Sequence, residues 1–83
     1  MGKKQPEHLA LGRAIRERRT TLGLSQEGLA NAAGIHRTYI GGIERGERNI
    51  AYTNLRRIAA ALGCRGSELV ADAEALERGA GSA

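Results

Sequence analysis

Aromatic residues are nearly absent from the sequence, with two Tyr and neither Phe nor Trp among its 83 residues. A core must therefore be built from Leu, Ile, Val and Ala, which suits closely packed helices better than a β-sandwich. No segment shows strand alternation or an Asn-Gly hairpin signal. The length corresponds to one domain. We therefore expect a single all-α domain.

Cysteine is limited to Cys64, so neither an intrachain disulfide nor a cysteine metal cluster can form. We interpret Cys64 as a small residue near a helix end in a reducing cytoplasm, with an intermolecular disulfide or a redox switch as the alternative. Neither His8 nor His36 has a second ligand at metal spacing. We expect no metal and no cofactor.

Long apolar runs are missing as well. No stretch of 18 or more apolar residues is present, so we expect no membrane span. No apolar segment follows the basic start of the chain, so we expect no signal peptide and a cytoplasmic protein. The sequence also lacks a Ser/His/acid or Cys/His pairing, a Gly-rich phosphate loop and a carboxylate pair in a cleft, so we predict that it is not an enzyme.

Charge gives the first positive indication of function. Residues 1–65 hold twelve Lys and Arg against five Asp and Glu, a net of +7, whereas residues 66–83 have a net charge of −3. A basic body with an acidic tail suits a polyanionic partner that is met by one face. Composition alone does not separate nucleic acid from an anionic membrane surface.

Apolar residues at helical spacing predict five short helices, over about 7–22, 25–33, 36–45, 53–62 and 67–78. We assign Leu22 to the apolar stripe of the first helix and Val70 to that of the fifth. Ser25 and Ser67 are expected to cap helices, as is Tyr52 or Thr53. The expected organisation is a flexible basic arm over 1–6, the domain over 7–78 and a flexible tail over 79–83.

The segment from 26 to 45 has the pattern of two helices joined by a tight turn. Ala30 is small enough for a close helix crossing, and Gly34 supplies the positive φ that the turn needs. Isoleucines at 35, 40 and 43 are expected to pin the second helix from inside. Arg37, Thr38 and the pair at 41 and 42 are left on the outer face, where a recognition helix enters the major groove.

These residues resemble the λ-repressor-like, Cro-type (Xre) helix-turn-helix regulators over about residues 9–69. The matching features are Gly23-Leu24-Ser25-Gln26, Ala30, Gly34-Ile35, Ile40 and Ile43-Glu44-Arg45-Gly46. Arg-Thr-Tyr-Ile at 37–40 followed by Gly-Ile-Glu-Arg-Gly at 42–46 is similar to restriction–modification controller proteins. The resemblance implies a compact five-helix domain whose helices 2 and 3 form the helix-turn-helix.

The resemblance also implies roles for individual residues. The residues implied to face DNA bases are Arg37, Thr38, Gly41 and Gly42. Those implied to contact the DNA backbone are Gln26, Tyr39, Arg45, Arg48, Asn49, Thr53 and Asn54. Arg19 and Glu44 match the positions of an internal ion pair that ties the first helix to the third.

Several side chains keep two interpretations. Thr38 either contacts DNA or serves the start of its helix, and His36 either reaches DNA or caps the same helix. Tyr39 either places its hydroxyl on a phosphate or packs its ring between helices. Gly41-Gly42 departs from relatives that carry a polar side chain at 41, and costs each position about 0.8–1 kcal/mol of helix stability. Either the helix backbone comes unusually close to DNA there, or the helix is merely softer.

The functional hypothesis is a transcription regulator, a repressor or controller, that binds a palindromic operator on double-stranded DNA as a homodimer. Ala73 and Leu76 in the fifth helix are the predicted dimer contacts, and the alternative is that this stripe packs on the first helix of the same chain. A rival hypothesis is an antitoxin that neutralises a partner toxin and regulates its own gene through the same motif. A third is an adaptor that bridges other proteins.

Overall fold

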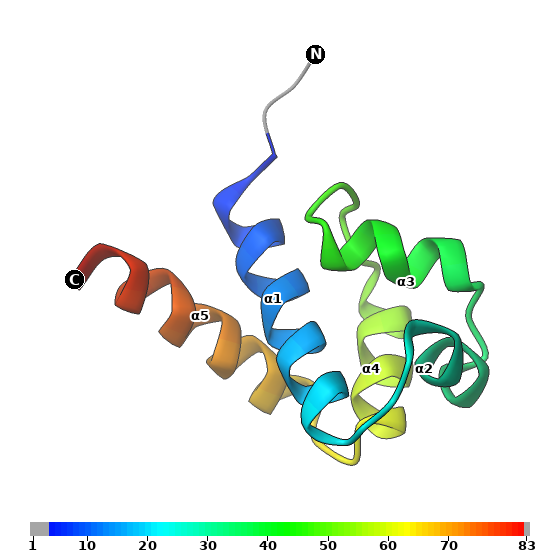
Figure 1. Ribbon diagram of the computed structural model, residues 1–83. Coiled ribbons are helices and arrows are strands. Elements are labelled where there is room, and N and C mark those ends of the chain that lie inside the picture. The colour runs from blue at the N-terminus through cyan, green and yellow to red at the C-terminus, as the bar shows by residue number, and fades with distance from the viewer. Residues whose placement is uncertain (1–3, 83) are drawn as a thin grey trace.

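The computed structural model describes residues 4–82, with side chains described as far as residue 79. Within this part of the chain the secondary structure consists of five helices and no strands (Figure 1). They are α1 (Pro6–Thr21), α2 (Gln26–Ala33), α3 (Arg37–Glu44), α4 (Tyr52–Ala61) and α5 (Gly66–Ser82). The predicted all-α class is confirmed.

Two of the helix starts follow the predicted chemistry. The Ser25 hydroxyl accepts a hydrogen bond from the backbone N–H of Gly28 (2.9 Å), and His36 Nδ1 accepts one from the N–H of Thr38 (3.1 Å). Both bonds satisfy backbone donors that the first turn of a helix leaves unpaired. His36 therefore acts as the cap of α3.

The other two predicted caps are wrong. The cap of α4 is Ala51, which offers no side-chain bond, and both Tyr52 and Thr53 lie inside the helix. Ser67 also lies inside α5, where the Glu68 carboxylate instead accepts the N–H of Arg65 (2.8 Å). An acidic residue in the first turn can perform this capping by reaching back along the chain.

The chain ends also differ from expectation. Pro6 is the first residue of α1 rather than part of an arm, because proline at the first position loses no helical hydrogen bond. The rest of the predicted arm that lies at 1–3 is outside the described residues, as is Ala83. α5 continues to Ser82 although a tail was predicted from Gly79. A glycine costs a helix only about 1 kcal/mol relative to alanine, so Gly79 does not by itself end the helix.

The largest fully buried side chains come from all five helices: Ile15, Leu29, Ile40, Ile43, Ile58 and Leu69. The predicted inward positions of Ile40 and Ile43 are confirmed. Leu22 and Val70 do not belong to the core stripes, because 54% and 38% of their surfaces are exposed. Leu22 is the C-cap residue, beyond the last packed turn of α1, and Val70 points about 100° away from Leu69 around α5.

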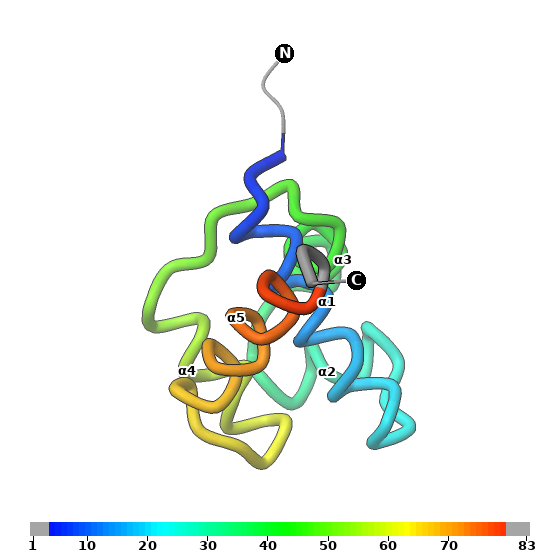
Figure 2. The backbone as a smooth tube through the Cα atoms, turned by 90° about the vertical axis from the view of Figure 1, so that its left-hand side faces the viewer, coloured from blue at the N-terminus to red at the C-terminus, as the bar shows by residue number. Residues whose placement is uncertain are grey.

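α1 lies between α5 on one side and the helix-turn-helix on the other (Figures 1 and 2). Small residues bring α1 and α5 close together: Ala10 and Ala14 pack against Ala73, with Leu76 at the edge of the cluster. Ala73 is only 5% exposed, so its assignment to a dimer interface is wrong. The alternative, packing on the first helix of the same chain, holds for this residue. None of the described helices combines the length and apolar character needed to cross a membrane.

Candidate nucleic-acid interface

α2 and α3 are short helices joined by a turn at Gly34. This residue has φ +71°, a left-handed conformation that glycine adopts without steric cost. Ala30 is 2% exposed in the contact between the helices. The buried isoleucines of α3 then fix which side of the helix faces outward. The first turn of α3 presents Arg37 and Thr38, both exposed, to solvent.

The orientation of α3 is also fixed by a buried ion pair. Arg19 of α1 donates from Nε and Nη2 to the two carboxylate oxygens of Glu44 at 2.7 and 2.9 Å. Only 11% and 3% of the two side chains are exposed. This hydrogen bonding raises the pKa of the Arg19 guanidinium. Two parallel hydrogen bonds of this kind fix the relative orientation of the two side chains in addition to pairing their charges.

Gln26 joins the same cluster from α2. Its Nε2 donates to Glu44 Oε1 at 3.0 Å, and Arg19 Nη1 donates to the carbonyl of Leu24 at 2.8 Å. Side chains from α1 and α2 therefore converge on one carboxylate of α3. Gln26 is half-buried in this arrangement, where it braces α3 next to the outward face.

The glycine pair of α3 is buried, although the sequence placed it on the exposed face. A Cβ at position 41 would lie 3.1 Å from Arg45 Nη1, and one at position 42 would lie 2.9 Å from Arg48 Nε. The missing side chains thus make room for two arginines that lie across the recognition helix. Helical spacing predicted the direction of these positions correctly but not the long side chains that cover them.

The Tyr39 ring packs within the chain, as in one of its two predicted interpretations, and the contact of its hydroxyl with a phosphate stays a prediction. Its ring is half-buried against the core, and the Arg48 guanidinium carbon lies 5.5 Å from the ring centroid. This distance is within the range of a cation–π contact, worth about 0.5–1 kcal/mol at an exposed site. Tyr39 therefore positions Arg48 over α3, a relation that no sequence pattern indicated.

The Thr38 side chain serves its own helix. Its hydroxyl lies 2.7 Å from His36 Nδ1, the atom that also accepts the Thr38 N–H. The hydroxyl is exposed, so a helix-start role and a DNA contact remain compatible. The remaining candidates flank α3. Asn49 is exposed in the loop before α4, while Thr53 and Asn54 occupy the first turn of α4.

Sequence reasoning missed one charged residue of this face, Glu47. Its Oε2 lies 2.9 Å from Arg45 Nε and 3.9 Å from Lys4 Nζ. The hydrogen bond from Arg45 lowers the pKa of the Glu47 carboxyl. The outward face of α3 and its following loop is thus basic, with one carboxylate in it.

The described residues offer little for other chemistry. Between residues 4 and 82 no group of three or more His, Cys, Asp or Glu is placed to hold a metal ion. Cys64 is half-buried, and burial raises the pKa of its thiol. A raised pKa keeps the thiol protonated and less nucleophilic.

A recognition helix held from inside by isoleucines and exposing a polar first turn defines the helix-turn-helix class of DNA-binding domain. The profile of the helix-turn-helix family (HTH_3) matches residues 15–69. The chain belongs to this family.

Individual relatives indicate which kind of helix-turn-helix protein this chain is similar to. Control protein C.BamHI from Bacillus amyloliquefaciens is 41% identical over 63 residues, which cover 75% of this chain and 78% of that protein. Control protein C.SmaI from Serratia marcescens is 48% identical over 52 residues, or 63% of this chain and 62% of that protein. The crystal structure of the restriction-modification controller protein C.AhdI from Aeromonas hydrophila matches with a TM-score of 0.77 and 43% identity, covering 78% of this chain and 98% of that one. The predicted resemblance to controller proteins is confirmed, and the protein is a DNA-binding transcriptional regulator.

Proposed function

We propose that this regulator binds a palindromic operator as a homodimer and reads it with α3 in the major groove. The carrying observation is the exposed Arg37 at the first turn of α3, beside a basic surface. This surface consists of Arg45, Arg48 and the neighbouring Asn49. Phosphate contacts from such residues supply affinity, while contacts to base edges supply specificity.

Selection of bound duplexes from random DNA tests this proposal most directly. A single recognition helix covers only a few base pairs, which is too little information to locate one genomic site. We therefore expect the enriched sequences to share a motif with two-fold symmetry. Enrichment of an asymmetric motif would contradict the palindromic operator, and no enrichment would contradict sequence-specific binding.

Arg37 is the proposed base reader, because its guanidinium fork suits the N7 and O6 atoms of guanine. Arg37→Ala is expected to weaken specific binding by about 1–3 kcal/mol and to relax the preference at one base pair per half-site. The measurement is a titration of the variant against the operator and against single-base-pair changes in it. Arg78→Ala, which removes an exposed arginine of α5 that lines neither hollow beside Leu76, is the control. An equal loss on every sequence would make Arg37 a phosphate contact.

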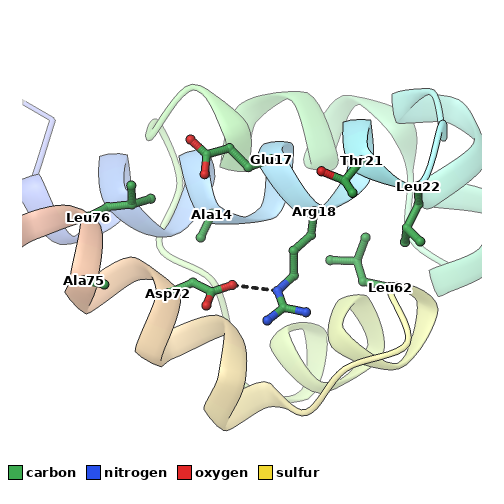
Figure 3. Close-up of a pocket in the computed structure, with 9 residues that line it drawn as sticks. All are labelled: Ala14, Glu17, Arg18, Thr21, Leu22, Leu62, Asp72, Ala75 and Leu76. Carbon is green, nitrogen blue, oxygen red and sulfur yellow. Dashed lines mark hydrogen bonds and ion pairs between the residues drawn. The ribbon is translucent and has the colours of Figure 1, made fainter. Parts of the chain in front are cut away.

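The dimer requires a surface away from α3, and Leu76 remains its proposed centre. It is half-buried and lies between two shallow hollows on α1 and α5, one toward Leu9 and one toward Leu22. Leu9 and Leu22 are 44% and 54% exposed. Figure 3 shows Leu76 and Leu22 on either side of the ion pair between Arg18 Nε and Asp72 Oδ2, 2.6 Å apart. A second copy would cover this exposed apolar surface.

Leu76→Glu tests this surface. We expect wild-type protein to sediment at micromolar concentration with about twice the chain mass, and the variant to sediment as one chain with nearly unchanged helical content. Val70→Glu is the control, because it makes the same change on another side of α5 where Val70 is already 38% exposed. If Val70→Glu dissociates the dimer and Leu76→Glu does not, the dimer interface is instead the surface that α4 and α5 form around Val70. A wild-type chain that stays monomeric both free and on its palindrome would contradict the dimer.

The antitoxin hypothesis gains no support from the comparisons. The relatives reported above are described as control proteins and a controller protein. Nothing in the described surface favours a toxin over a second copy of the chain.

A further inference from the structure

Glu47 is a carboxylate among the cations of the proposed DNA-binding face. It lies in the loop that follows α3, on the far side of the turn at Gly46, and pairs with Arg45 across that turn. The same oxygen, Oε2, faces both Arg45 Nε and Lys4 Nζ. One acidic side chain thus engages two of the cations available to a phosphate backbone.

The pair also fixes where Arg45 lies. Its guanidinium is folded back over position 41, with Nη1 3.1 Å from the point where a Cβ would be. Gly41 provides the space and Glu47 provides the attraction. The guanidinium is thereby held against α3 rather than extended toward a phosphate. To extend toward a phosphate, Arg45 must release the Glu47 carboxylate.

We propose that Glu47 is a specificity-determining residue that restrains sequence-independent binding by engaging Arg45 and Lys4 in the free protein. This inference rests on the proposed function, in which the α3 face meets DNA. Sequence-independent affinity comes almost entirely from phosphate contacts, so a carboxylate that competes with phosphate acts on this component directly. A regulator that must find one site among many non-specific ones benefits from such a restraint.

Glu47→Gln removes the charge and keeps the size of the side chain. On a duplex without the operator, we expect tighter binding and a steeper dependence of affinity on salt. One additional phosphate contact changes the slope of log K against log salt by about −0.9. The ratio of the variant's affinity to that of wild type should then fall by about 3.5-fold between 50 and 200 mM salt, as this change in slope requires.

Glu74→Gln is the control. Glu74 is an exposed carboxylate of α5, away from α3, and it lines neither of the two hollows beside Leu76. The substitution makes the same chemical change and raises the net charge by one, as Glu47→Gln does. We expect this control to keep the wild-type salt slope.

Fluorescence anisotropy on operator and non-operator duplexes, at four or more salt concentrations, separates the outcomes. A steeper non-operator slope for Glu47→Gln alone supports the inference. An unchanged slope, or an equal change in Glu74→Gln, overturns it while the operator preference of wild type still upholds the proposed function. If wild type shows no preference for any selected sequence, the proposed function fails and the inference fails with it.

Discussion

Replacing Glu44 with alanine is expected to reduce the free energy of unfolding by about 3–5 kcal/mol. The carboxylate accepts two hydrogen bonds from Arg19 and one from Gln26, and its side chain is 3% exposed. Removing it leaves the Arg19 charge in a buried site without its partner. Burying the unpaired Arg19 charge costs more free energy than the intact pair contributes to stability. The reason is that pairing offsets most of the cost of removing the two charges from water.

For a domain of this size, 1 kcal/mol shifts the melting temperature by about 4–8 °C. We therefore expect a drop of at least about 12 °C, measured by circular dichroism during heating. Glu17→Ala is the control, since it breaks an exposed pair of the same residue types four positions apart in α1. Exposed helix pairs contribute only about 0.3–0.5 kcal/mol, so its melting curve should nearly overlay that of wild type. Equal curves for Glu44→Ala and wild type would show that the buried pair contributes nothing to stability.

The fold was largely predictable because its signals are local. Glycine after each of the first four helices and apolar residues at helical spacing define the elements, and Gly34 marks the turn of the motif. Contacts between distant residues are different in kind. Opposite charges at 19 and 44 do not by themselves predict a pair across 25 positions, and only the family resemblance brought these two together.

The wrong predictions concern surfaces for which the sequence does not show what packs against them. Spacing predicts that Ala73 lies on the same side of α5 as Leu69, but it does not say whether α1 or a second chain covers that side. Similarly, spacing predicts the direction of Gly41 and Gly42 but not that Arg45 and Arg48 fold back over them. Long flexible side chains from a neighbouring turn are set by tertiary packing, which a helical pattern does not contain.

The structural role of Gly12 was not predictable from the sequence. In α1 it reads as a weak helix position, since glycine costs a helix about 0.8–1 kcal/mol relative to alanine. In the structure it is the point where α1 meets the end of α3. A Cβ there would overlap the carbonyl oxygen of Ile43 and would lie 2.8 Å from that of Glu44. Both neighbours are backbone atoms, so no side-chain rotation can relieve the contact.

Gly12→Ala should therefore destabilise the domain, although alanine is the better helix former. Overpacking costs about 1–3 kcal/mol, and we expect about 3 kcal/mol because α1 and α3 must separate. Urea unfolding measures the loss. Gly79→Ala in α5 is the control, since a Cβ there meets nothing within 4 Å and should stabilise slightly through helix propensity. Opposite signs for the two substitutions would attribute the loss to the helix crossing. A stabilised Gly12→Ala would instead show that the two helices can move apart freely, contrary to a rigid α1–α3 contact.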